Sequence, residues 1–336
     1  MKDIYILAVE SSCDETSIAI VKNGKDVIGL EVNTQMDTHA LYGGVVPEIA
    51  SRMHTESITL VLDSLLKKTQ FNLDNIDAIA VTYAPGLLGS LLVGVEFAKT
   101  LSYIYNKPLI KVNHMVGHIY ANNIEDHLEF PLLAMVVSGG HTELVEMTGD
   151  YEFNLLGATL DDAIGEAYDK VAKVLNVSYP GGPNVERLAK SGNACYDLGK
   201  PVNDNSLNFS YSGLKSSVIN FVHNYKQRGE EININDLAAS FQYAAVDEIK
   251  RKVEIALNRN NYKMIVLAGG VSANEYLRTE IDNLAHEKNI RLVVPRMIYC
   301  TDNAAMIGAA AYPLFVKNKN IVDFSLNAKS HISTVE

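Results

Sequence analysis

The chain has 336 residues, of which 47% are hydrophobic and 21% are charged, and this composition is typical of a globular protein with two domains. The formal net charge of −11 excludes a globally basic surface for binding nucleic acid, although it leaves room for a local basic face. The three cysteines lie far apart in the sequence, which argues against a disulfide framework and against a cysteine metal site.

The apolar run near the N-terminus, residues 4–9, is too short for a signal peptide. No apolar stretch of the sequence reaches the length of a transmembrane helix. We therefore expect a cytoplasmic protein that does not use a membrane.

The first half of the chain predicts three strands, a long amphipathic helix, a buried strand, a glycine turn that opens a helix, and a last strand. The three strands form a meander, because the Asn23-Gly24 pair before the third strand is typical of a tight hairpin turn. In that order, we expect these elements at residues 4–9, 16–21, 27–32, 47–68, 76–81, 85–89 and 108–112.

The second half of the chain repeats this order of elements. They are expected at residues 132–137, 142–147, 151–156, 236–258, 264–268, 269–274 and 290–294. A segment at residues 157–233 has no counterpart in the first half and is the best candidate for extra substrate contacts. The duplication predicts an α/β fold of two lobes, each a mixed sheet flanked by helices, with a ligand cleft between the lobes.

We place the first lobe at residues 1–112, completed by a C-terminal helix at 303–325, and the second lobe at 113–302. The turns between the first two strands of each lobe, residues 11–15 and 138–141, are expected to point into the cleft. The two glycine turns should point there as well, since α/β sheets bind ligands at the ends of their strands.

Two histidines, His114 and His118, stand four residues apart in a segment that can be helical. On a helix both rings leave the same face, one turn apart, where they can hold a single metal ion. The spacing is similar to that of zinc peptidases, but Met115 stands where those enzymes have their general-base glutamate. The pair suggests a metal site and argues against peptide hydrolysis, with a chance spacing of purely structural use as the alternative.

Two polar turns between apolar strands suggest contacts with phosphate. In residues 136–142, two glycines let a phosphate approach backbone N–H groups, and Ser138 and Thr142 can donate hydrogen bonds. The alternative is a plain hairpin. In residues 10–17, acidic groups and hydroxyls suit Mg²⁺ and phosphate, and the alternative is a solvated loop.

Two further glycine-rich turns, residues 268–274 and 179–187, each lead into a helix. In the first, Gly269 and Gly270 leave room for an adenine ring or a ribose, and Asn274 can bond hydroxyls or ring nitrogens. This turn lacks the G-x-G-x-x-G pattern, which disfavours a nicotinamide enzyme. In the second, glycines beside prolines fix a backbone against which a ribose can lie, with a purely structural loop as the alternative.

Two acidic segments are predicted to be helical. Residues 161–170 predict a helix with a solvent-facing row of acidic side chains. Cys300 precedes the final helix, for which Thr301 or Asp302 is the expected N-cap. An Asp302 close to the two histidines would complete a site of two histidines and one carboxylate with open positions for substrate.

Taken together, these segments resemble the tRNA adenosine threonylcarbamoyltransferase family, which includes bacterial TsaD and was formerly called the Gcp glycoprotease family. The matching pieces follow the order of the family across nearly the whole chain, and their joint presence is far more specific than any single piece. They are residues 10–16, 114–118, 137–142, 168–170, 179–183, 211–215, 269–274 and 300–303.

The resemblance implies the duplicated RNase H-like lobes of the actin, Hsp70 and sugar-kinase ATPase superfamily. It also implies an acyltransferase of tRNA threonylcarbamoyladenosine biosynthesis. Such an enzyme moves the threonylcarbamoyl group of threonylcarbamoyl-AMP to the exocyclic amine of the adenosine 3′ of the anticodon, in tRNAs that read codons beginning with A. The implied partner proteins are TsaB and the ATPase TsaE, on a surface of first-lobe helices such as residues 90–102.

By motif, the resemblance assigns His114, His118 and Asp302 to one divalent metal ion, with iron preferred over zinc, and it leaves room for Mg²⁺ with a nucleotide. One departure is Val116, where bacterial members commonly have a glutamate between the two histidines. The residues assigned to the adenylate substrate are Val136, Val137, Ser138, Gly139, Gly140, Asp169, Gly182, Asn274 and, for the ribose, Glu186.

Three other functions stay open at the level of sequence. A small-molecule kinase of the same fold would need a general-base aspartate and has no use for the histidine pair. A nucleotide-binding scaffold would tolerate the loss of His114, and a metallopeptidase would need the base that is missing. For the transfer reaction itself no general base is assigned, and Asp14 and Glu15 are the candidates.

Overall fold

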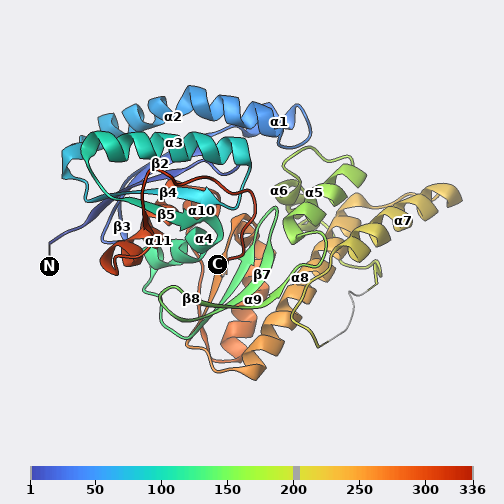
Figure 1. Ribbon diagram of the computed structural model, residues 1–336. Helices are drawn as coiled ribbons and strands as arrows, with labels where there is room; N and C mark the ends of the chain where they lie inside the picture. Colours follow the sequence, from blue (N-terminus) through green and yellow to red (C-terminus); the bar gives the residue numbers. More distant parts are fainter. Residues whose placement is uncertain (1, 200–204, 335–336) are drawn as a thin grey trace. The chain divides into compact units, whose positions relative to one another are not determined.

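The computed structural model describes residues 2–199 and 205–334 of the chain (Figure 1). The chain forms two compact units. Unit 1 is made of Met1–Leu128 and Pro295–Glu336, and unit 2 of Glu129–Val294. Each unit contains one mixed β-sheet with helices packed on it.

The sheet of unit 1 has six strands in the order β11-β5-β4-β1-β2-β3. β1, β4 and β5 are parallel to one another, whereas β2, β3 and β11 run antiparallel to their neighbours. The strands are β1 (Tyr5–Glu10), β2 (Glu15–Lys22), β3 (Asp26–Thr34), β4 (Ala78–Ala84), β5 (Leu109–Asn113) and β11 (Ile321–Val322).

Helices cover both faces of this sheet (Figure 1). Val9 of β1 belongs to the core under α2 and α3, whereas Ala8 faces the other way, toward Gly308 of α11. On that second face α4 packs against α11, and Gly117 of α4 lies against Ile307, so that the two helices approach closely. The helices are α1 (Met36–Ala40), α2 (Pro47–Thr69), η1 (Leu73–Asn75), α3 (Leu88–Tyr105), α4 (His114–Glu125), α10 (Met297–Cys300) and α11 (Ala304–Val316).

The sheet of unit 2 has five strands in the order β10-β9-β6-β7-β8. β6, β9 and β10 are parallel, and β7 and β8 continue the sheet in antiparallel pairs. The strands are β6 (Leu132–Val137), β7 (Thr142–Gly149), β8 (Glu152–Ala158), β9 (Met264–Ala268) and β10 (Arg291–Val293).

The core of unit 2 lies between this sheet and the helices of the unit. Among these helices, α8 packs against α6, α7 and α9. Tyr168 of α5 meets Phe241 of α8 edge to face with ring centroids 5.0 Å apart, and both side chains are fully buried. The helices are α5 (Ile164–Val174), α6 (Gly181–Ala189), α7 (Ser212–Arg228), α8 (Ile234–Arg259), η2 (Gly270–Ala273) and α9 (Glu275–Glu287).

The duplication predicted from the sequence is confirmed. The sheet order β3-β2-β1-β4-β5 of unit 1 is repeated as β8-β7-β6-β9-β10 in unit 2. In both units the first strand and the fourth are parallel neighbours, so their carboxyl ends lie at the same edge of the sheet. The turns that follow these strands therefore come together within each unit.

The helix that was expected from residue 161 begins instead at Ile164. The two preceding carboxylates have other partners. Asp161 accepts the N–H of Tyr211 at the start of α7, and Asp162 pairs with Lys215 at 2.8 Å. The prediction of a helical, solvent-facing acidic row is therefore wrong for these two residues, because tertiary partners hold them outside the helix.

The boundaries of the two units differ from those expected for the two lobes. Residues 113–128 and 295–302, expected in the second lobe, lie in unit 1, where α4 packs on α11 and Arg296 pairs with Glu125. The C-terminal helix expected at 303–325 is α11, which ends at Val316 before the short strand β11. Among the residues that the structure describes, no helix is long and apolar enough to cross a membrane.

Candidate functional site

The two histidines of the predicted pair lie at the start of α4 in unit 1. The helix begins there because the side-chain oxygen of Asn113 accepts the N–H groups of Met115 and Val116. The rings of His114 and His118 leave the same side of the helix with centroids 4.7 Å apart. Both side chains are buried. The spacing in the sequence thus becomes a close pair of imidazoles in the interior.

Asp302 reaches this pair from the segment that precedes α11. Its Oδ1 lies 3.1 Å from Nε2 of His118 and 3.4 Å from Nε2 of His114. The expectation that Thr301 or Asp302 caps the final helix is wrong, because the side chain of Asn303 accepts the N–H of Met306 in the first turn. The Asp302 carboxylate consequently faces the two histidines instead of the helix end.

This donor set fits a divalent metal ion. The three ligand atoms lie within 4.8 Å of one another, and tetrahedral bonds of about 2.1 Å place ligand atoms roughly 3.4 Å apart. Although Nε2 of His118 is close to Asp302, neither ring nitrogen has an aligned hydrogen-bond partner among the described residues. Leaving a buried imidazole in this state is costly. A cation between the three side chains would remove that cost.

The charges of the three groups depend on one another. Burial disfavours the charged form of Asp302, but His114 and His118 outweigh burial and hold the pKa of this carboxyl far below its ordinary value. Burial lowers the pKa of His118, so its ring is neutral near pH 7. Burial also acts against a charge on His114, yet Asp302 and Glu10 raise its pKa well above the ordinary value. Asp302 and His118 therefore have the ionisation states in which carboxylates and imidazoles bind metals, whereas His114 releases a proton when a metal ion binds.

Three residues that the sequence did not connect with the histidine pair surround His114. Its Nδ1 lies 3.0 Å from Oε2 of Glu10 and 3.1 Å from Oγ of Ser12, and Thr82 donates its hydroxyl to Glu10. The sequence contains a hint of this group. Glu10 and Thr82 each follow an apolar run, and these two runs form the adjacent parallel strands β1 and β4, whose carboxyl ends lie at the same edge of the sheet.

The turn at residues 11–15 is mostly buried, so a solvated loop is the wrong interpretation of this segment. His54 holds the turn, since its Nε2 donates to the carbonyl of Cys13 and its Nδ1 accepts the hydroxyl of Thr16. Burial, with Asp302 and Asp14 nearby, raises the pKa of Glu15 well above its ordinary value. A carboxyl group in these surroundings can keep a proton at a pH where an exposed glutamate has lost it.

In unit 2, the turn after β6 presents its backbone beside the start of α5. Gly139 and Gly140 have open space where a Cβ atom would stand. Gly165, the second residue of α5, comes so near that a Cβ there would lie 2.6 Å from the carbonyl oxygen of Ser138. The turn therefore lies at a helix N-terminus, where N–H groups and the helix dipole favour an anion. Ser138 and Thr142, expected as donors, each accept one backbone N–H.

The ends of two parallel strands bring this turn next to the second glycine turn. Val136 of β6 is the register partner of Ala268 of β9. Gly269 has a φ of 88°, which favours glycine. A Cβ atom added there would meet the carbonyl oxygen of Val137 at a distance that is too short for any other residue. Because the side chains of Val136 and Val137 are fully buried, these residues can contact a ligand only through their backbone.

Asp169 of α5 and Gly182 of α6 meet where these two helices pack. Asp169 accepts the N–H of Gly181 at 2.9 Å, and Gly182 has open space on its outer side. Burial raises the pKa of Asp169, against the opposite effect of the N–H groups of Gly181 and Gly182. A carboxylate thus borders a glycine surface that a flat or hydroxylated ligand can approach.

Glu186 and Asn274 meet at the start of α9. Glu186 accepts the N–H of Glu275 at 2.9 Å, and Asn274 caps α9 while donating to Oε1 of Gln242 at 3.1 Å. The hydroxyl of Tyr168 donates to the same oxygen at 3.4 Å. The nine residues expected to contact the adenylate therefore form one row, which runs from the turn after β6 over α5 and α6 to α9.

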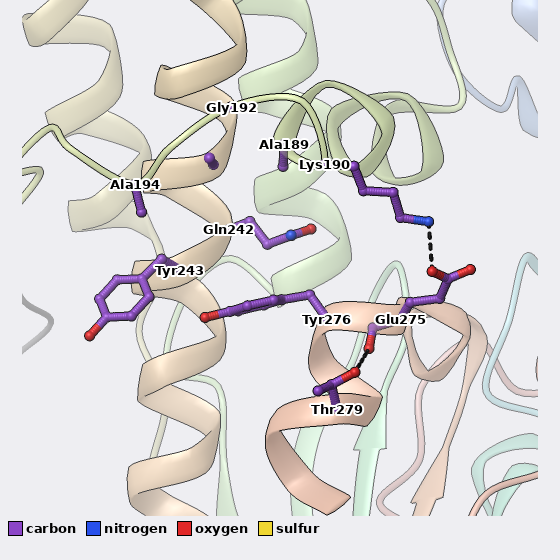
Figure 2. Close-up of a pocket in the computed structure, with 10 residues that line it drawn as sticks. Ala189, Lys190, Gly192, Ala194, Gln242, Tyr243, Glu275, Tyr276 and Thr279 are labelled. Atoms are coloured by element: carbon purple, nitrogen blue, oxygen red, sulfur yellow. Dashed lines mark hydrogen bonds and ion pairs between the residues drawn. The ribbon is translucent and has the colours of Figure 1, made fainter. Parts of the chain in front are cut away.

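A pocket of about 350 Å³ adjoins this row (Figure 2). The ring of Tyr276 extends across it toward Tyr243, and an ion pair of 2.8 Å between Lys190 and Glu275 stands at one side. Because the oxygen of Gln242 already accepts two hydrogen bonds, its NH₂ group is what this side chain offers to the pocket. The sequence prediction missed these residues, since no motif indicates that α6, α8 and α9 line a common pocket.

A family model described as "TsaD: tRNA N6-adenosine threonylcarbamoyltransferase" matches residues 26–309. The chain belongs to the TsaD family. Two relatives named tRNA N6-adenosine threonylcarbamoyltransferase extend this match. The protein of Anoxybacillus flavithermus is 51% identical over 329 residues, which cover 97% of this chain and 96% of that protein. The protein of Bacillus subtilis is 51% identical over 318 residues, covering 94% and 92%.

Solved structures share the fold of this TsaD-family chain at low sequence identity. HypF of T. kodakarensis has a TM-score of 0.64 at 14% identity, with 94% of this chain and 48% of that chain covered. Component A of the (R)-2-hydroxyglutaryl-CoA dehydratase of Acidaminococcus fermentans has a TM-score of 0.53 at 14% identity, with 92% and 98% covered. At this identity the likeness shows the fold alone. The expected α/β fold of two duplicated units, each a mixed sheet flanked by helices, is confirmed.

Proposed function

We propose that this chain transfers the threonylcarbamoyl group of threonylcarbamoyl-AMP to the exocyclic amine of the adenosine 3′ of the anticodon, in tRNAs that read codons beginning with A. The observation that carries the proposal is the match to the TsaD family and to its tRNA N6-adenosine threonylcarbamoyltransferases over nearly the whole chain. The reaction takes place in the cytoplasm.

The row of residues in unit 2 holds the adenylate in this proposal. The phosphate lies against the backbone of Val136, Val137, Ser138, Gly139 and Gly140, where the N-terminus of α5 favours an anion. The ribose hydroxyls lie between Asp169, Gly182 and Glu186, since carboxylates accept hydroxyl protons and the glycine leaves space. Asn274 borders the adenine, which enters the pocket beside Tyr276, where an aromatic ring can stack on a base.

One divalent metal ion is held by His114, His118 and Asp302, and the preference for iron over zinc rests on the family resemblance. When bound, the ion would supply a Lewis acid for an oxygen of the substrate. Three protein ligands of mixed imidazole and carboxylate type leave coordination positions for substrate. Around the site, His114 is oriented by the carboxylate of Glu10.

The transfer needs no covalent enzyme intermediate. The amine nitrogen of adenosine attacks the carbamoyl carbon, a nitrogen–carbon bond forms, the carbon–oxygen bond to the phosphate breaks, and AMP leaves while the amine loses one proton. Orientation of the two substrates and stabilisation of the departing phosphate supply the acceleration. Asp14 and Glu15, in the turn at residues 11–15 of unit 1, are the candidates for the group that accepts the proton, and Glu15 can do so only after it loses the proton that its raised pKa favours.

The partner proteins in this proposal are TsaB and TsaE. Near its C-terminal end the helix α3 carries two adjacent exposed apolar side chains, Tyr103 and Ile104, and neighbouring exposed apolar groups are typical of a contact surface. Replacing Tyr103 and Ile104 together by alanine should abolish co-purification with TsaB. A Lys226→Ala change on the exposed side of α7 is the control and should leave it intact. Retained co-purification of the double variant would place the TsaB surface elsewhere.

The transfer is tested by incubating the chain with threonylcarbamoyl-AMP, unmodified tRNA, TsaB and TsaE. Threonylcarbamoyladenosine is then measured by mass spectrometry of the digested tRNA, with the Bacillus subtilis relative as the active comparison. Absence of the modified nucleoside in the presence of an active comparison protein contradicts the proposal. Full retention of function in a His114→Ala variant would instead favour a non-catalytic scaffold that binds nucleotide and partner proteins, and phosphorylation of a small molecule would favour a kinase.

A further inference from the structure

We propose that Glu10 is a positioning residue of the metal centre, whose carboxylate orients His114 so that Nε2, and not Nδ1, faces the metal ion. This inference rests on the proposed metal site and is independent of whether tRNA is the substrate. It concerns a residue at the end of β1 that the sequence connected with Mg²⁺ and phosphate but not with the histidine pair.

Glu10 is a fully buried carboxylate whose oxygens are surrounded by donors. The N–H of Ser12 donates to Oε1 at 2.6 Å, and the hydroxyl of Thr82 donates to Oε2 at 2.5 Å. Nδ1 of His114 lies 3.0 Å from the same Oε2. Among the described residues no lysine or arginine pairs with Glu10. A carboxylate at such depth is retained only where its hydrogen bonds are satisfied, and His114 is the one ionisable donor of the three.

The sheet places these groups together. β1, β4 and β5 are neighbouring parallel strands, so their carboxyl ends lie side by side. Glu10 is the last residue of β1, Thr82 lies near the end of β4, and α4 begins with His114 directly after β5. The position of Glu10 next to His114 is therefore set by rigid elements and not by a loop.

The contact decides which nitrogen of His114 can bind a metal. A carboxylate accepts hydrogen bonds only, so Nδ1 carries its hydrogen toward Glu10. Nε2, on the other side of the ring, then presents its lone pair to the point that it shares with Asp302 and His118. Histidine ligands commonly donate their second nitrogen to a carboxylate in this way, which fixes the ring and increases its basicity.

Glu10 itself is not a ligand in this arrangement. Its oxygens face Ser12, Thr82 and Nδ1, whereas the ligand atoms of the candidate site are on His114, His118 and Asp302. The two histidines also differ. Nδ1 of His118 has no hydrogen-bond partner among the residues that the structure describes, so only His114 has a carboxylate at its Nδ1.

The first test compares zinc binding to the wild-type chain and to Glu10→Gln. The carboxamide keeps the volume of the side chain but replaces one oxygen by an NH₂ group. This group must face either Thr82 and His114 or the N–H of Ser12. When it faces His114, it donates to Nδ1 and forces the hydrogen of His114 onto Nε2. We expect zinc affinity, measured by competition with a chromophoric chelator, to fall by about 10- to 100-fold. The matched control is Glu248→Gln, which neutralises another buried carboxylate in unit 2 and should leave the affinity unchanged. Thermal unfolding verifies that both variants are folded.

The second test needs no variant of Glu10. In the zinc-loaded wild-type chain with ¹⁵N-labelled histidine, two-bond nitrogen–proton correlations should show His114 bound through Nε2 with a protonated Nδ1, with the signals assigned by single histidine substitutions. Coordination through Nδ1 would overturn the proposal even if Glu10→Gln failed to fold. A folded Glu10→Gln chain that binds zinc as tightly as the wild type would overturn it too. Absence of zinc binding to the wild type would remove the metal centre itself, and the role of Glu10 with it.

Discussion

Replacing Gly165 by alanine tests the close contact between α5 and the turn after β6. A Cβ atom at this position would lie 2.6 Å from the carbonyl oxygen of Ser138 and 2.8 Å from Cα of Gly139. Both are backbone atoms, so neither can swing away as the end of a flexible side chain does. The turn must move, and we expect the variant to lose both stability and the alignment of the turn with the helix N-terminus.

Two opposing effects set the size of this loss. Overpacking a closely packed contact costs about 1–3 kcal/mol of unfolding free energy, whereas alanine in place of glycine in a helix contributes at most about 1 kcal/mol. Overpacking therefore exceeds the gain in helix propensity, or at least cancels it. The chain offers a matched control in Gly213, which is the second residue of α7, as Gly165 is of α5, but where an added Cβ atom would meet nothing within 4 Å.

The assay is urea denaturation of the intact chain for both variants and the wild type. Gly213→Ala should be as stable as the wild type or slightly more stable, and Gly165→Ala should be less stable than Gly213→Ala by about 1–3 kcal/mol, because helix propensity cancels in this comparison. The KM for threonylcarbamoyl-AMP should rise in Gly165→Ala alone. If the two variants are equally stable, the contact at Gly165 is not as tight as the geometry indicates and the reasoning is refuted.

Three further predictions concern the metal site, an ion pair and the pocket. Asp302→Asn should bind less than about a tenth of the zinc or iron that the wild type retains, since a neutral amide replaces the anionic ligand, and elemental analysis after dialysis would contradict this if both retained equal metal. Burial would raise the pKa of Asp162, but its hydrogen bonds to Lys170 and Lys215 outweigh burial and lower it. The stabilisation is therefore present above the unfolded pKa of about 3.9 and disappears as the pH falls through the lower folded value, so thermal unfolding of Asp162→Asn should show a deficit at pH 7 that closes in acid, and a deficit independent of pH would refute this assignment. Tyr276→Ala should raise the KM for threonylcarbamoyl-AMP by about 2- to 10-fold through loss of stacking, and an unchanged KM would place the adenine outside the pocket.

The sequence by itself predicts what depends on short-range patterns. Alternating and apolar runs predict the strands on both sides of the duplication, and the four-residue spacing of His114 and His118 predicts a pair on one helical face. These predictions hold because the relevant contacts are between near neighbours along the chain. The resemblance in motifs added the family, which the comparison with known proteins confirms.

Only the tertiary structure decides which distant groups meet. Asp302 and Asn303 are both good N-cap residues, and the choice of Asn303 follows from the packing of α11 on α4, which turns the Asp302 carboxylate toward the histidines. In the same way, Glu10 contacts His114 because β1, β4 and β5 are adjacent in the sheet, and strand order is not encoded in the pattern of any single strand. Side chains far apart in sequence acquire a common site only when the packed core fixes the elements that carry them, and local propensity contains no record of that packing.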